Sequence, residues 1–261
     1  MASIRVLLQV TAGLTIRSAP TRTILDVETY RASDGRVIIP SSSIKGALRH
    51  AACYAAPQLG LTCCGRRSPE GMVQRHALLA SKGLGLCYRD EDGAVIPLCH
   101  VCGLFGSVRY MSPLFIEDAE PVDMVNTVQL PGIEVDDYTG TAASGKLYFR
   151  EAIVPGTLFE AKIHVDLGRV EALYSPGPRG CGGGEAAAPD DRCWWLKLLS
   201  GALRLLEAVG IGAGAARAWI TGVEVDGRAA VEPREAAGLL GCGDSEALRV
   251  VWLSERVLGI V

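Results

Sequence analysis

The first periodic feature of the chain is a series of short runs in which apolar and polar residues alternate or β-branched residues cluster. Such runs are typical of strands that pack one face on a core. A Pro-Gly pair between two of the runs predicts a tight turn between neighbouring strands. The runs lie at residues 4–11, 114–119, 147–153, 158–165 and 218–225, and a further run in the tail lies at residues 249–253.

Residues 41–56 are predicted to form the first long helix. Pro40 closes the loop before it, and Ser41 or Ser42 can cap the helix by accepting a backbone N–H. We expect the helix to end near Pro57, because a proline inside a helix removes a backbone hydrogen bond and clashes with the preceding turn.

A second helix follows Asp191, where Trp195, Leu198 and Leu203 recur at helical spacing, and a short third helix is predicted at residues 233–240. Without the insertions, the order of elements is strand, helix, strand, strand, helix, strand. That order predicts an α+β fold with a ferredoxin-like or RRM-like βαββαβ core. Many RNA-binding domains share this frame, but the fold alone does not assign a function.

The chain of 261 residues is interpreted as a single domain. Three of its segments lie outside the predicted βαββαβ core. Residues 57–103 are rich in Cys, Gly and Arg, show little periodicity, and are interpreted as an insertion. Residues 120–146 are polar and rich in turn residues, so they are expected to leave the sheet as an excursion. Residues 226–261 are interpreted as a C-terminal extension.

Composition narrows the class of protein further. The apolar share is 49% and the charged share is 21%, which is enough material for a core. No apolar run approaches the roughly 20 residues that span a bilayer, and the N-terminus does not resemble a signal peptide, so a cytoplasmic protein is expected. The net charge of −3 means that any nucleic-acid-binding cations must be placed locally.

The cysteines suggest a metal site. The chain has nine, an odd number, and their spacing favours metal ligation over a disulfide framework. Cys99 and Cys102 can ligate one ion from a tight turn. Any two residues of an upstream set could complete a closed tetrahedral site for structural zinc, which would stabilise an insertion that has few apolar residues. That upstream set is Cys63, Cys64, His76 and Cys87.

Two alternatives to the metal site remain open. Cys99 and Cys102 could form a redox pair, or the cysteines of the insertion could be scattered core residues. The remaining cysteines are interpreted as packed or structural. They are Cys53, Cys181, Cys193 and Cys242.

The segment IIPSSSIKGALR, residues 38–49, resembles the IPGSSLKGxLR signature of the RAMP superfamily, the repeat-associated proteins that form the backbone of CRISPR effector complexes. VCGLFGS resembles the cysteine-then-LFG segment of type III backbone subunits. TGTAASGKLYFREAIVPGTLFEAKI resembles the paired strands that follow a protruding hairpin, and GIGAGAARAWITGVEV resembles the C-terminal glycine-rich loop and strand. These three segments occupy residues 101–107, 139–163 and 210–225, in the family's order.

The resemblance implies that the serine-rich turn and the first helix hold the backbone of a guide RNA. A helix N-terminus suits phosphate, Lys45 and Arg49 share one side of the helix, and Gly46 allows close approach. The alternative is an ordinary capped helix with a solvated basic edge. The predicted RNA-binding residues are Ser41, Ser42, Ser43, Lys45, Arg49, Arg22, Gly212 and Gly214.

The long loop before Pro40 contains Asp26. In target-cleaving members of the family an aspartate in this loop is required to cut RNA, so the resemblance implies a catalytic role for Asp26. Its carboxylate could help to hold Mg²⁺ or Mn²⁺, or orient a 2′-hydroxyl for in-line attack on the adjacent phosphate. Glu28 and Asp34 are the other candidates in the loop, and a surface aspartate in a turn is the alternative.

The resemblance also implies partners. Residues 120–146 would form a thumb that wedges between bases of a guide–target duplex, with Met124, Val125 and Leu130 as wedge residues. Copies of the chain would associate along guide RNA, contact target RNA and other effector subunits, and need no membrane. Two alternatives are a non-catalytic RNA-binding scaffold and a stand-alone metal or redox protein.

Overall fold

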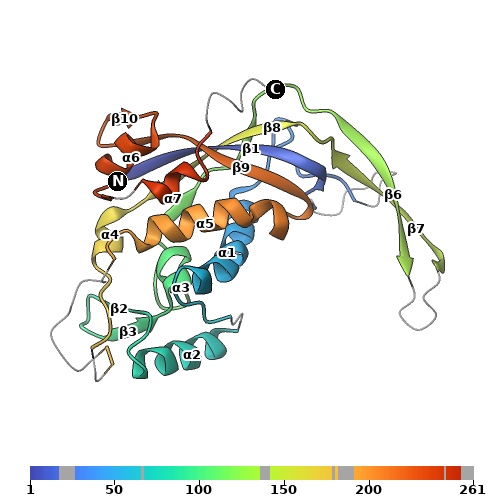
Figure 1. Ribbon diagram of the computed structural model, residues 1–261. Helices are drawn as coiled ribbons and strands as arrows, with labels where there is room; N and C mark the ends of the chain where they lie inside the picture. The colour runs from blue at the N-terminus through green and yellow to red at the C-terminus, as the bar shows by residue number, and fades with distance from the viewer. Residues whose placement is uncertain are drawn as a thin grey trace.

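A computed structural model shows a twisted antiparallel sheet covered on one face by helices, with a long hairpin that projects from one end (Figure 1). It describes residues 1–17, 27–65, 68–135, 142–177, 180–181, 191–243 and 245–253. The helices are α1 (Ser41–Gln58), α2 (Pro69–Ser81), α3 (His100–Phe105), α4 (Leu167–Glu171), α5 (Trp194–Val209), α6 (Pro233–Leu239) and α7 (Glu246–Arg249). The strands are β1 (Ala2–Thr15), β2 (Leu86–Arg89), β3 (Val95–Leu98), β4 (Leu114–Ile116), β5 (Glu120–Pro121), β6 (Thr127–Val135), β7 (Ala142–Ile153), β8 (Leu158–Val165), β9 (Ala213–Val225) and β10 (Arg228–Ala230).

The predicted fold class is confirmed by the order of four strands. The strands β4, β8, β1 and β9 lie side by side, and every neighbouring pair is antiparallel. Along the chain these strands are second, third, first and fourth of the core, and α1 and α5 provide the two helices. This is the ferredoxin-like βαββαβ arrangement.

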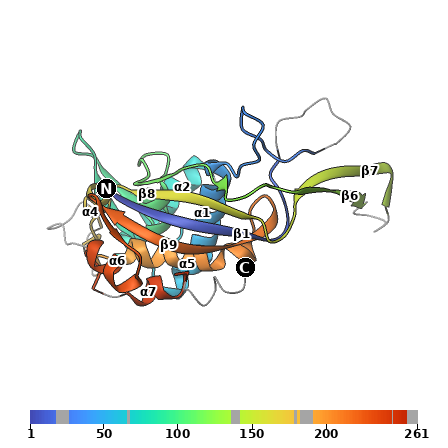
Figure 2. The ribbon, with the colours of Figure 1, turned by 90° about the horizontal axis from the view of Figure 1, so that it is seen from above.

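Strand β1 is the centre of the core. Its alternate residues Ile4, Val6, Leu8 and Val10 are buried, as the period of a strand requires when one face is covered. Helices α1 and α5 cover that face, and the opposite face of the strands is seen from above in Figure 2. The two helices approach closely because Gly201 on α5 lies against Ala55 on α1.

The segment interpreted as an insertion has more regular structure than its sequence indicates. Ser68 caps α2 by accepting from the Gly71 N–H at 3.2 Å, and a proline follows at the first helical position. The short β2–β3 hairpin and α3 complete the segment. Helix α1 continues through Pro57 to Gln58, so the helix extends slightly beyond its predicted end.

Six cysteines form disulfides, contrary to the expectation that metal ligation would dominate. The bonded cysteines are 10, 94 and 49 residues apart along the chain. Two of the three disulfides therefore close long loops, which the local spacing of the cysteines could not reveal. The pairs are Cys53–Cys63, Cys87–Cys181 and Cys193–Cys242.

The hairpin β6–β7 overlaps the segment predicted to leave the sheet, and it extends beyond the strands of the core (Figures 1 and 2). Its base joins β1, where Ile153 pairs with Leu14. The tail differs from its predicted strand: α7 precedes a single parallel bridge between Trp252 and Ile220.

The glycine-rich turn before β9 and the start of that strand fit only because Gly212 and Gly214 lack side chains. A Cβ atom on Gly214 would lie 2.6 Å from both the Gly13 carbonyl oxygen and the Leu14 Cα of β1. A Cβ atom on Gly212, which also has a φ of +56°, would lie 2.6 Å from the Thr15 carbonyl oxygen. The backbone of this turn therefore lies directly against β1.

We expect Gly214→Ala to destabilise the protein by about 1–3 kcal/mol, because backbone atoms of β1 must move to admit the methyl group. Gly238→Ala is the matched control, since Gly238 is a helical glycine with nothing within 4 Å of its Cβ position. Denaturant unfolding of both variants measures the difference. Equal stabilities for the two variants would contradict the close approach.

Candidate metal centre and adjoining groove

Four buried side chains from separate parts of the insertion meet at one point: Cys64, His76, Cys99 and Cys102. Cys64 follows α1, His76 lies on α2, Cys99 precedes α3, and Cys102 lies within α3. Their ligand atoms all lie within 4.8 Å of one another. Three sulfurs and one imidazole nitrogen form a donor set typical of closed, structural zinc sites.

The geometry of the cluster fits a tetrahedral ion. The Sγ atoms of Cys64 and Cys102 are 3.7 Å apart, and two sulfurs bonded to one zinc at about 2.3 Å lie roughly 3.8 Å apart. The Cys102 N–H donates to Cys99 Sγ at 3.3 Å, so the turn already points hydrogen-bond donors at sulfur. His76 Nε2 is buried and has no hydrogen-bond partner among the described residues, which a ligating nitrogen would explain.

The thiols of Cys99 and Cys102 resist ionisation in this space. A hydrogen bond from Cys102 lowers the pKa of Cys99, but the neighbouring Cys64 and burial outweigh it and raise that pKa to about 11. Hydrogen bonding to Cys64 and Cys99, together with burial, also raises the pKa of Cys102. A bound divalent cation would reverse the balance, because metal binding favours the thiolate.

The predicted ligand set is corrected at two positions. Cys63 is bonded to Cys53 and Cys87 is bonded to Cys181, and a disulfide sulfur is not available as a thiolate ligand. The cysteines outside the three disulfides are Cys64, Cys99 and Cys102, and all three belong to the cluster.

A groove of about 670 Å³ runs beside the cluster. Its walls come from four stretches: α1, residues 63–65 just after it, the start of α3, and the glycine-rich turn at the end of α5. Cys64 and Cys102 lie in its wall, so the metal cluster and the groove share a boundary. Among the predicted RNA-binding residues, the groove is lined by Ser42, Ser43, Arg49 and Gly212.

The start of α1 differs from the predicted cap. The N-cap is Pro40 with no side-chain cap, and the Ser41 N–H donates to the Asp118 carboxylate at 2.7 Å. The first backbone N–H of the helix is therefore already hydrogen-bonded to an acidic side chain. Ser42 is exposed and Ser43 is half-buried, and both line the groove.

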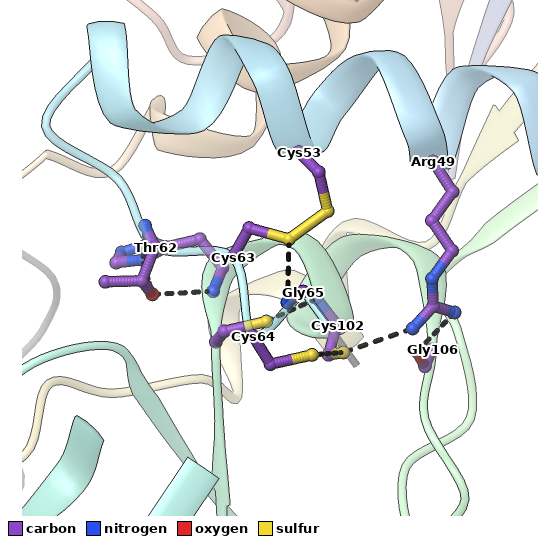
Figure 3. The surroundings of a disulfide bond; sticks show 10 residues. Arg49, Cys53, Thr62, Cys63, Cys64, Gly65, Cys102 and Gly106 are labelled. Carbon is purple, nitrogen blue, oxygen red and sulfur yellow. Dashed lines mark hydrogen bonds between the residues drawn. A yellow bond between two sulfur atoms is a disulfide. The ribbon is translucent and has the colours of Figure 1, made fainter. Parts of the chain in front are cut away.

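The two cations of α1 contact protein atoms. Lys45 Nζ donates to the Leu114 carbonyl oxygen at 2.7 Å, and burial together with the charge of Arg49 lowers the pKa of Lys45. Arg49 donates to the Gly106 carbonyl oxygen at 3.0 Å and to Cys102 Sγ at 3.2 Å (Figure 3). Lys45 does not line the groove, whereas Arg49 does.

The other predicted positions fall in different places. Arg22 and Asp26 lie outside the described residues. Asp34 forms an exposed turn, pairing with Arg36 at 2.6 Å, and this arrangement holds the pKa of Asp34 below its usual value. Gly214 packs on β1 rather than in the groove.

The predicted wedge residues differ in exposure. Met124 is 86% exposed. Val125 is partly buried and packs on the core, and Leu130 reaches the position where Gly13 would carry a Cβ atom. Of the three, Met124 projects furthest into solvent.

Two groove residues were missed by the sequence analysis. His50 and Tyr54 are exposed on α1 and line the groove, with ring centroids 5.2 Å apart. The signal was present in the spacing, because Ser42, Gly46, His50 and Tyr54 follow one another at four-residue intervals and so share a face of the helix.

The model of the family described as the RAMP superfamily matches residues 8–218. A search of the curated proteins finds no match. Among the described residues, no helix has the length and apolar character needed to cross a membrane.

The purified protein is expected to carry one zinc ion per chain, and Cys64→Ser should lose it with a fall in melting temperature. The matched control is the double variant Cys53→Ser/Cys63→Ser. It should keep the zinc, while the loss of its disulfide lowers the free energy of unfolding by about 2–4 kcal/mol. Elemental analysis and thermal unfolding measure both quantities. If the double variant lost the zinc and Cys64→Ser retained it, the assignment of Cys64 rather than Cys63 as a zinc ligand would be wrong.

Proposed function

The chain belongs to the RAMP superfamily, which supports a CRISPR-associated RNA-binding role, and we propose that it is a guide-RNA-binding backbone subunit of a type III CRISPR effector complex. The observation that carries the proposal is the convergence of three family-like motifs on one groove. Gly46 comes from the first motif, Val101 from the second and Gly212 from the last. Residues separated by more than half the chain are thus brought to one surface.

The chemistry of the groove favours a sugar-phosphate backbone. The hydroxyls of Ser42 and Ser43 can donate to phosphate oxygens, and Gly46 leaves open space where a side chain would stand. Because Asp118 occupies the first amide of α1, the phosphate contacts fall on the hydroxyls and on later turns of the helix. The rings of His50 and Tyr54 extend the same face and offer surfaces for base stacking.

In this proposal the hairpin β6–β7 is the thumb of the subunit. Exposed apolar side chains are present along it and at its approach, among them Met124, Val128 and Phe149. Such side chains can insert between base steps of a guide–target duplex, where their packing against the unstacked bases offsets the cost of unstacking. Copies would associate along the guide RNA, with other effector subunits at the ends and with the complex placed in the cytoplasm.

We further propose that Asp26 cleaves bound target RNA with Mg²⁺ or Mn²⁺. The chain immediately after it is firmly placed: the Val27 N–H donates to the Phe149 carbonyl oxygen at 3.3 Å, and the Glu151 N–H donates to the Val27 carbonyl oxygen at 2.8 Å. The loop therefore re-enters the fold at the base of the thumb, beside the proposed duplex. A divalent cation there would neutralise charge as phosphate is attacked.

A non-catalytic scaffold is the second candidate. The net charge of −3 and the two α1 cations that contact protein atoms favour it, because both reduce the positive charge available to two RNA strands. In that case another subunit cuts the target.

Gly46→Glu should weaken guide-RNA binding by on the order of tenfold, about 1.4 kcal/mol, because it places a carboxylate in the proposed phosphate path. Gly238→Glu adds the same charge to an exposed glycine of α6, outside the groove, and should bind RNA as the unmodified protein does. Filter binding at fixed salt, with thermal unfolding as a check on folding, measures the difference. Equal RNA affinities of the two variants would show that RNA does not bind in this groove.

Asp26→Ala should abolish metal-dependent cleavage of complementary RNA in the assembled complex and leave target binding intact, because the carboxylate is assigned to chemistry only. Asp34→Ala is the control, since Asp34 is paired with Arg36 in a turn. Gel analysis of labelled target with Mg²⁺ or Mn²⁺ measures cleavage. Cleavage by Asp26→Ala at the unmodified rate would exclude its role, and absence of cleavage by the unmodified complex would favour the scaffold.

A further inference from the structure

Arg49 connects the groove helix to the metal cluster. Its guanidinium reaches from α1 to α3, donating to the carbonyl oxygen of Gly106 at the C-terminal end of that helix at 3.0 Å and to Sγ of Cys102 within the helix at 3.2 Å (Figure 3). The Cys102 sulfur also lies 3.7 Å from Cys64 Sγ, inside the ligand cluster. A cation is therefore hydrogen-bonded directly to a side chain of the metal centre.

The charge of the cluster explains why a cation belongs there. Three thiolates and a neutral imidazole around Zn²⁺ carry a net charge of −1 in a buried space, which is costly without compensation. Arg49 supplies one positive charge and an N–H···S hydrogen bond to the same group. Partners of this kind orient ligands and tune their basicity.

We propose that Arg49 is a positioning residue of the metal centre, which holds Cys102 in its ligating orientation and neutralises the excess negative charge. This role goes beyond RNA binding and does not depend on it. It also gives the Arg49 of the motif a structural partner other than phosphate. Because the same side chain is part of α1, it couples the wall of the groove to the occupancy of the cluster.

The test measures the Zn²⁺ affinity of the 261-residue chain in the absence of RNA. Arg49→Gln should weaken Zn²⁺ binding by about 10–100-fold in a chelator competition, as loss of an outer partner does at other metal sites. Arg49→Lys should recover part of that loss, because it restores the charge without the planar two-point contact. Arg75→Gln, an exposed arginine beside His76, removes the same charge and should bind Zn²⁺ as the unmodified protein does.

Substitution with Co²⁺ supplies a second readout. The sulfur-to-cobalt charge-transfer band should shift in Arg49→Gln, because one thiolate loses its hydrogen bond, and stay unshifted in Arg75→Gln. Unchanged Zn²⁺ affinity and an unchanged band in Arg49→Gln would overturn the proposal, as would an equal loss in Arg75→Gln. If Arg49→Gln does not fold, Arg49→Lys with full Zn²⁺ affinity and an unshifted band would overturn it. Since RNA is absent, failure here leaves the groove assignment standing.

Discussion

The position of helix α1 is the constraint on which the groove depends. Beyond its apolar contacts with the sheet and with α5, four polar or covalent links hold it: Ser41 to Asp118, Lys45 to the start of β4, Arg49 to α3, and the Cys53–Cys63 disulfide. Each link ends in a different segment, so the helix cannot rotate about its axis without breaking at least one of them. Its exposed face therefore has a fixed direction, which a binding surface requires.

The core of the fold could be predicted from the sequence because its signals are local. The period of two in β1 and the helical spacing after Asp191 reflect burial of one face, and burial of one face is what builds a two-layer domain. The insertion could not be read in this way, because its structure rests on cross-links between distant residues. Cys63 and Cys64 are adjacent in sequence but have different partners, and no local pattern distinguishes them.

The candidate site could be predicted only in part, because local spacing does not reveal contacts between distant residues. The four-residue spacing of Lys45 and Arg49 places them on one side of a helix, but it does not say what that side meets. Their acceptors are carbonyl oxygens 69 and 57 residues away along the chain. The four residues that could hold a metal all lie in the stretch from which the ligands were predicted, whereas the choice among the upstream cysteines needed the tertiary structure.

The buried Glu151 sets a mechanical condition on the hairpin. Its carboxylate accepts from the Thr29 N–H at 3.1 Å and pairs with Arg31, while its backbone belongs to β7. The hairpin and the chain that returns from the long loop are consequently anchored to the same residue. A displacement of one at its root is transmitted to the other, so the root of the hairpin and residues 29–31 cannot move independently.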